Sequence, residues 1–187
     1  MSNRLKLESV DIPDLKILRR TPHSDERGMF ERLFCAEELQ GLLGGRHIVQ
    51  VNRSVTRQRG AVRGMHFQRA PHAEIKFITC LRGAVFDVAV DLRASSPTFL
   101  KWRAELLSAD EPKGFIIPTG FAHGFQALSP NCELLYLHTA AFHPESEGAV
   151  NALDPMLGIA WPEPITHRSQ RDSAAPMLAR DFGGLAQ

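Results

Sequence analysis

The sequence predicts a mainly β fold, a sandwich or barrel of the jelly-roll kind with a few short helices. Short apolar runs recur along its 187 residues, and 14 glycines and 12 prolines punctuate them as turn residues. The run Gly83–Asp91 alternates apolar with small or acidic residues, which is the period of a strand. Many short strands at regular spacing are typical of closed or two-sheet β architectures.

The other predicted strands are runs of the same kind. They are Ile48–Asn52, Val62–Gln68, Ile75–Leu81, Trp102–Leu107, Gly114–Ile117, Phe125–Leu128 and Glu133–Thr139. Helix is predicted at Ala36–Leu43, which stops at Gly44-Gly45 as a C-terminal cap. A second short helix is predicted at Ala175–Phe182. The sequence contains no repeat or low-complexity segment, so we expect residues 1–187 to form a single domain.

The composition restricts the cellular location and the binding partners that we expect for the chain. The formal net charge is +1, which gives no overall field for nucleic acid or an anionic membrane. No run approaches the ~20 apolar residues of a membrane span, and the N-terminal residues carry too much charge for a signal peptide. Cys35, Cys80 and Cys132 lie far apart without a CxxC pattern. We therefore expect free thiols in a cytoplasmic protein with no membrane or nucleic-acid partner.

The first candidate for chemistry is His66, in the run Arg63-Gly64-Met65-His66-Phe67-Gln68. A histidine within a strand serves as a general base, a metal ligand or a satisfied core residue, and taken alone the core role is at least as common. Arg63 and His66 would lie on opposite faces of a regular strand. A bulge at Gly64 would turn both side chains into the barrel. Other polar residues in runs that should line a barrel are Gln50, Asn52 and Gln68.

His123 ends the run Pro118-Thr119-Gly120-Phe121-Ala122-His123. This PxGxxH spacing resembles the cupin superfamily of small β-barrels, in many of which the histidine helps to bind a metal. The HxH that normally supplies further ligands is missing around His66. Zinc or iron sites generally need three or more protein ligands. The residues that could be combined into such a set are His66, His123, Glu133 and His138, but their spacing in the sequence does not match a metal-binding motif. We therefore expect no metal.

Tyr136 is the only tyrosine in the chain. It serves either as a packed residue with a bonded hydroxyl or as an acid that donates a proton and recovers it, and the residues alone favour neither. Two further polar stretches, Ser24–Glu31 and Ser169–Asp172, are typical of solvated turns when taken alone.

Together and in this order, the motifs resemble the dTDP-4-dehydrorhamnose 3,5-epimerase family. The resemblance runs from about Asp14 to Pro176 and includes DERGMFER, QVNRS, VRGMHFQ, FDVAVDLRASSPTF, IIPTGFAHGF, ELLY, SEG, LDPMLGIAWP and the closing Asp172. It implies a cupin-type jelly-roll β-barrel, usually a homodimer with strands contributed between subunits. It also implies epimerisation of a nucleotide-linked 4-keto-6-deoxy sugar at C3, C5 or both, without a cofactor.

The resemblance implies roles for particular residues. His66 would remove the proton beside the C4 ketone, Asp172 would hold His66, and Tyr136 would return a proton to the opposite face. Lys76 would lie near the ketone oxygen, where a cation stabilises an enolate. The implied substrate-binding positions around the sugar and diphosphate are Arg27, Glu31, Gln50, Asn52, Arg63, His123 and Arg171.

One stretch departs from the family. An aromatic residue that commonly follows the catalytic tyrosine stacks on the base, and here the corresponding stretch is Ala140-Ala141-Phe142, with Ala141 where Tyr or Trp is frequent. The identity of the base therefore stays open. Three alternatives also stay open: a related sugar-nucleotide ketoisomerase, a metal-dependent cupin oxygenase or isomerase, and a non-catalytic binding module.

Overall fold

The structure, a computed structural model, describes residues 3–186, and its regular elements are almost all strands. The strands are β1 (Leu5–Ser9), β2 (Lys16–Arg20), β3 (His23–Asp25), β4 (Gly28–Phe30), β5 (Gln50–Thr56), β6 (Val62–Gln68), β7 (Lys76–Arg82), β8 (Ala84–Asp91), β9 (Trp102–Ser108), β10 (Lys113–Ile117), β11 (Phe121–Ala127), β12 (Cys132–His138) and β13 (Glu147–Ala149). The helices are α1 (Gln40–Leu43) and α2 (Gln170–Ser173). In the described part of the chain, neither has the length or apolarity to cross a membrane.

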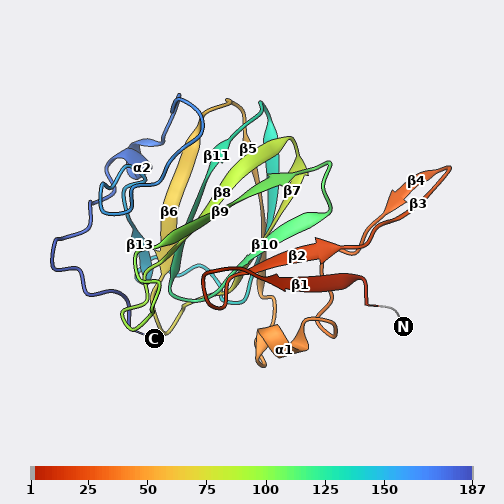
Figure 1. Ribbon diagram of the computed structural model, residues 1–187, viewed down its shortest axis with the longest axis horizontal. Coiled ribbons are helices and arrows are strands. Elements are labelled where there is room, and N and C mark those ends of the chain that lie inside the picture. Colours follow the sequence, from red (N-terminus) through yellow and green to blue (C-terminus); the bar gives the residue numbers. More distant parts are fainter. Residues whose placement is uncertain (1–2, 187) are drawn as a thin grey trace.

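Two antiparallel sheets stack face to face, and a separate hairpin projects from them (Figure 1). One sheet has the order β1-β2-β10-β7-β12-β5 and the other has the order β13-β6-β11-β8-β9. The hairpin is β3–β4. The mainly β prediction is therefore confirmed, and each predicted strand run overlaps an observed strand. Strands β1, β2 and β13 and the hairpin strands β3 and β4 were not predicted, because each is only three to five residues long.

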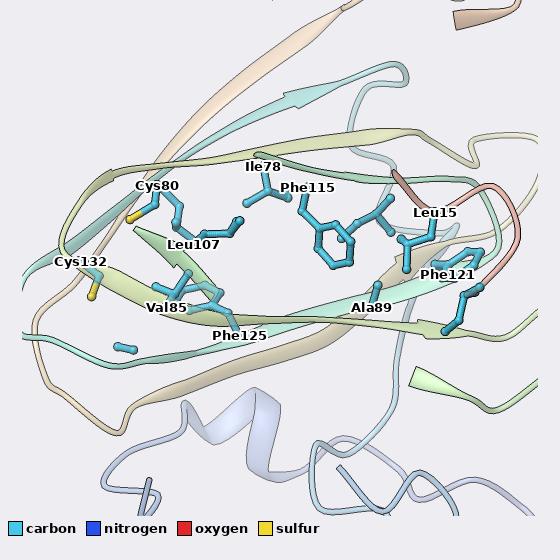
Figure 2. Close-up of a cluster of buried hydrophobic side chains, with 14 residues drawn as sticks. Leu15, Ile78, Cys80, Val85, Ala89, Leu107, Phe115, Phe121, Phe125 and Cys132 are labelled. Carbon is cyan, nitrogen blue, oxygen red and sulfur yellow. The ribbon is translucent and has the colours of Figure 1, made fainter. Parts of the chain in front are cut away.

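The space between the two sheets holds an apolar core (Figure 2). Ile78 and Phe115 reach in from the six-stranded sheet, and Val85 and Phe125 face them from the five-stranded sheet. All four side chains are buried. This packed core fixes the separation of the sheets.

The outer face of the five-stranded sheet is also buried. Val88 and Val90 of β8 pack there against Val150 and Leu157 from the C-terminal part of the chain. The polar-looking face of β8 consequently points between the sheets, where Asp87 is fully buried. The alternation of β8 thus separates two buried environments rather than core from solvent.

The structure corrects both helix predictions. Residues 36–39 form turns, and only Gln40–Leu43 are helical, although Gly44 caps them in the left-handed conformation as predicted. The helix predicted at Ala175–Phe182 is wrong. There the backbone bonds to other segments, since the Leu178 amide donates to Asp154. Leu178 and Phe182 pack over the outer face of the five-stranded sheet, so the segment is an irregular strap.

Strand β6 contains the predicted bulge. Its pairing with β11 shifts register between the pairs Arg63–Phe125 and His66–His123. Gly64 has φ +116°, and a Cβ at this position would lie 2.6 Å from Gly124 Cα. Close contact between the two backbones therefore requires glycine here. As a result, Arg63 and His66 both line the cavity described below, as predicted.

Replacing Gly64 with alanine is expected to lower the free energy of unfolding by about 2–4 kcal/mol, through steric overlap and backbone strain. Denaturant unfolding measures this change. Gly41→Ala is the matched control, because a Cβ there meets nothing within 4 Å. Equal stability of the two variants would contradict the close-approach account of the bulge.

Candidate active site

A cavity of about 700 Å³ opens between the two sheets. This volume suits a small-molecule ligand of substantial size. Nine of the sequence-predicted site residues line it: Gln50, Asn52, Arg63, His66, Lys76, His123, Tyr136, Arg171 and Asp172. Strands from both sheets contribute, so a bound ligand would be contacted from two opposite sides.

His66 and Asp172 form a hydrogen-bonded pair, with 2.7 Å between His66 Nε2 and Asp172 Oδ1. A carboxylate only accepts, so Nε2 carries the proton and Nδ1 is the basic nitrogen of the ring. Asp172 lies in α2, where the Ser169 hydroxyl accepts from its backbone amide as an N-terminal cap. The loop and the short helix thus hold the carboxylate against β6.

The pKa of Asp172 reflects this environment. Burial raises it, but the hydrogen bonds from His66 and Ser169 outweigh burial and bring it below its ordinary value. Because the folded-state pKa lies below the unfolded one, Asp172 stabilises the fold at neutral pH. That contribution is lost as the pH falls through the folded-state pKa.

Tyr136 reaches the cavity from β12, which belongs to the sheet opposite His66. Its hydroxyl accepts a hydrogen bond of 3.4 Å from Ser54 Oγ, and its ring lies edge-on to His123 with 6.0 Å between centroids. Burial raises the pKa of Tyr136 above its ordinary value. The phenol is therefore protonated at neutral pH and is available as an acid.

His123 forms a second imidazole–carboxylate pair. Its Nε2 lies 3.0 Å from both carboxylate oxygens of Asp87. Burial raises the pKa of Asp87, and the adjacent His123 and Lys76 only partly offset this effect. Asp87 was not among the predicted site residues, because the alternation of β8 gives no sign that this acid faces a histidine on β11.

A third pair lies beside Lys76 and was also missed. Glu74 Oε2 is 2.7 Å from His138 Nδ1, and Glu74 Oε1 is 3.2 Å from Lys76 Nζ. Lys76 also lies 3.4 Å from the backbone carbonyl of His66. His138 Nε2 contacts Asn52 Nδ2 at 3.3 Å. Glu74, Lys76 and His138 are all largely buried at the cavity wall.

Two of the predicted binding residues do not line the cavity within one chain. Arg27 sits at the tip of the β3–β4 hairpin and pairs with Asp25 there. The hairpin projects away from the barrel (Figure 1), which separates Arg27 from the other site residues. Glu31 follows the hairpin and forms an ion pair of 2.8 Å with Arg20.

The residues considered as metal ligands do not converge. His66, His123 and His138 each engage a separate carboxylate, and Glu133 pairs with Arg53. Within residues 3–186, the cluster of three ligand-type side chains with atoms within 4.8 Å is His72, His143 and Glu145, none of which lines the cavity.

Phe142 lies at the cavity and not in the buried core. It is 50% exposed, it lines the cavity, and its backbone amide donates to Gln50 Oε1 at 2.9 Å. The loop that carries it is held further by Gln68, whose amide bonds to Ala141 and His143. An exposed apolar ring thus lines the cavity.

Fold and site together define a two-sheet β-barrel enzyme equipped for proton transfer, with a histidine–carboxylate pair on one side of the cavity and a phenol on the other. Comparison with known proteins identifies the family. Residues 9–180 match the family described as dTDP-4-dehydrorhamnose 3,5-epimerase. The chain belongs to this family and is an epimerase.

Three relatives illustrate the match. A dTDP-4-dehydrorhamnose 3,5-epimerase from Salmonella typhimurium is 42% identical over 169 residues, covering 89% of this chain and 92% of that protein. The crystal structure of dTDP-6-deoxy-D-glucose-3,5-epimerase RmlC from Legionella pneumophila, in complex with dTDP-4-keto-L-rhamnose, is 41% identical, with a TM-score of 0.86 and 92% coverage of each chain.

The third is ChmJ, a 3'-monoepimerase from Streptomyces bikiniensis, crystallised with dTDP as a double mutant with a histidine changed to asparagine and a tyrosine to phenylalanine. It is 34% identical, with a TM-score of 0.83, covering 90% of this chain and 85% of that chain.

Proposed function

We propose that this chain, acting as one domain, epimerises a dTDP-linked 4-keto-6-deoxy sugar at a carbon beside the ketone, without a metal or redox cofactor. The observation that carries the proposal is the His66–Asp172 pair on one sheet, with Tyr136 reaching the same cavity from the other. Inversion needs a base on one face of the sugar and an acid on the opposite face, and the two sheets supply them.

In the first step, His66 takes the proton from the carbon beside the ketone. The electrons of that C–H bond form the enolate, whose charge develops on the ketone oxygen. His66 becomes an imidazolium, and the Asp172 carboxylate stabilises this charge and holds the ring in one tautomer. A positioned general base typically contributes ~10²–10⁴ in rate.

Lys76 stabilises the enolate. Its ammonium has three donors, of which two face the His66 carbonyl and Glu74, so one remains for the ketone oxygen. A fixed cation in a largely buried position stabilises developing negative charge without the reorganisation that water would require.

In the second step, Tyr136 donates its phenolic proton to the opposite face of the carbon, which regenerates the ketone with inverted configuration. The histidine then holds one extra proton and the tyrosine lacks one, so a proton returns from His66 to Tyr136 through solvent before the next cycle. The sum is an isomerisation that consumes no oxidant and no reductant.

The rest of the cavity suits the nucleotide. Arginines at its wall, such as Arg63 and Arg171, have the planar donor fork that binds phosphate in a bidentate manner. The exposed Phe142 ring provides an apolar surface on which the base stacks, in place of the aromatic residue missing at position 141.

Replacing Phe142 with alanine is expected to raise KM by about 10-fold while kcat changes little, because stacking on a base contributes ~1–3 kcal/mol to binding. Steady-state kinetics measure both constants. Phe99→Ala is a useful comparison, since Phe99 packs against Phe182 and does not line the cavity. An unchanged KM for Phe142→Ala would contradict the stacking role.

A homodimer explains the position of the hairpin. Met29 and Phe30 of the hairpin are 60% and 70% exposed, and Val51 of the edge strand β5 is 57% exposed. Such apolar surface is typical of an interface. In a dimer, the hairpin would carry Arg27 and Glu31 toward the cavity of the second copy. Sedimentation should give a dimer mass for the native chain and a monomer mass for the Met29→Ser/Phe30→Ser variant.

A cytoplasmic location is supported by the state of the cysteines. All three are free thiols, and burial raises the pKa of Cys80 to about 11, which leaves it unreactive.

The proposed function is tested by incubating the purified chain with dTDP-4-keto-6-deoxyglucose and, in parallel, with GDP- and CDP-linked 4-keto-6-deoxy sugars. We expect epimerised product from the dTDP substrate alone. NMR of the product assigns inversion to C3, C5 or both. A product with a moved carbonyl would indicate a ketoisomerase, and activity lost to a chelator would indicate a metal-dependent reaction.

A further inference from the structure

The third imidazole–carboxylate pair, Glu74–His138, has no part in the mechanism above although it lies at the wall of the same cavity. Strand pairing places His138 between Lys76 on β7, which the proposed mechanism uses, and Gln50 on β5, which is a predicted binding residue. Two residues away along the same strand pair, Asn52 pairs with Tyr136. The pair thus lies between the candidate catalytic cation and a candidate binding amide.

The contacts define the tautomer of His138. Its Nδ1 lies against the Glu74 carboxylate, which only accepts, so Nδ1 carries the proton. Its Nε2 lies 3.3 Å from the amide nitrogen of Asn52, which only donates, so Nε2 accepts. Asn52 therefore keeps its carbonyl oxygen for a ligand, and each ring nitrogen of His138 orients a different partner.

Glu74 divides its two oxygens in the same way. Oε2 accepts from His138 and Oε1 accepts from Lys76 at 3.2 Å. The lysine chain is long and flexible, and among the described residues its ammonium is held by Glu74 and the His66 carbonyl. If His138 released Glu74, the carboxylate would lose its fixed direction and the ammonium would lose one of its two anchors.

We propose that His138 is a positioning residue with two separable functions: through Glu74 it aims the Lys76 ammonium, and through Asn52 it presents an amide oxygen to the substrate. The proposal rests on the proposed function. It assigns the Nδ1 contact to the chemical step and the Nε2 contact to substrate binding. The loss of one contact should therefore change kcat, and the loss of the other should change KM.

Two substitutions of His138 separate these contacts. The amide nitrogen of asparagine is as many bonds from Cα as Nδ1, so His138→Asn keeps a donor for Glu74 and loses the contact with Asn52. The amide group of glutamine matches Nε2, so His138→Gln keeps an acceptor for Asn52 and loses the contact with Glu74. Each variant serves as the control for the other.

Steady-state kinetics on dTDP-4-keto-6-deoxyglucose test the proposal. We expect His138→Gln to lower kcat by about 10-fold with KM within twofold of wild type, because a displaced catalytic group slows the chemical step. We expect His138→Asn to raise KM by about 5-fold with kcat near wild type, because one neutral hydrogen bond is lost.

Glu74→Gln repeats the kcat test without altering His138, and about a 10-fold loss is expected from the weakened anchor of Lys76. Glu105→Gln is the matched control, because Glu105 has the same 9% side-chain exposure and also pairs with a lysine, Lys113, but does not line the cavity. It should leave both constants unchanged.

The outcomes are distinguishable. A wild-type chain without epimerase activity overturns the proposed function itself. An active wild type whose two His138 variants change kcat and KM alike, or change neither, overturns the positioning role. Thermal unfolding of each variant shows whether it is folded. If the His138 variants do not fold, Glu74→Gln decides, and an unchanged kcat in that variant rejects the proposal.

Discussion

Replacing His66 with asparagine is expected to lower kcat by ~10²–10⁴ while the protein stays folded, because the general base is removed. Asparagine offers no basic nitrogen to the sugar, and its amide matches the position of Nδ1 rather than of Nε2, so the contact with Asp172 is also lost. Because Lys76 contacts His66 at its backbone carbonyl and not at its ring, the position of Lys76 should survive the substitution. Steady-state kinetics measure kcat, and thermal unfolding shows whether the variant is folded.

The matched control is His47→Asn, since His47 is exposed and does not line the cavity. It should behave as wild type. Activity of His66→Asn within a few-fold of wild type would show that another group abstracts the proton. His123 would then be the next candidate, because it pairs with His66 across β6 and β11 and is also held by a carboxylate.

Replacing Tyr136 with phenylalanine is expected to separate proton removal from inversion. The ring and its contacts with His123 and His138 remain, and only the hydroxyl is lost. His66 should still remove and return a proton on its own face, so exchange with solvent persists. Inversion should slow by ~10² or more, because the acid on the opposite face is absent.

This result is measured by comparing the rate of deuterium uptake with the rate of product formation in the same sample. Exchange that outpaces inversion supports the two-face account. Equal losses of exchange and inversion would mean that Tyr136 acts in proton removal as well, or that His66 needs it for position.

Local patterns predicted much of the fold and part of the site. The period-two pattern and turn residues located the central strands, and Gly64 indicated the bulge that turns Arg63 and His66 into the cavity. The failed helix at Ala175–Phe182 shows the limit of propensity. There, contacts with distant residues such as Asp154 replace the local hydrogen bonds that a helix requires.

The pairings within the site depend on strand register, which no local pattern reveals. Asp87 meets His123 because β8 and β11 are neighbours, and Glu74 meets His138 near the pairing of β7 with β12. The His66–Asp172 contact joins residues 106 positions apart, and in the sequence it rested on resemblance to the family alone. The side chains that line the cavity were thus predictable where a backbone feature such as the Gly64 bulge directs them inward, whereas their hydrogen-bond partners were not.

Proton NMR of the wild-type chain with dTDP-4-keto-6-deoxyglucose in heavy water tests proton transfer at the carbons beside the ketone. We expect deuterium to replace hydrogen at C3, C5 or both, at no other carbon, and we expect the same carbons to invert. Epimerised product without deuterium, or no exchange at any carbon while the enzyme is folded and binds the substrate, would contradict proton transfer through an enolate as the mechanism.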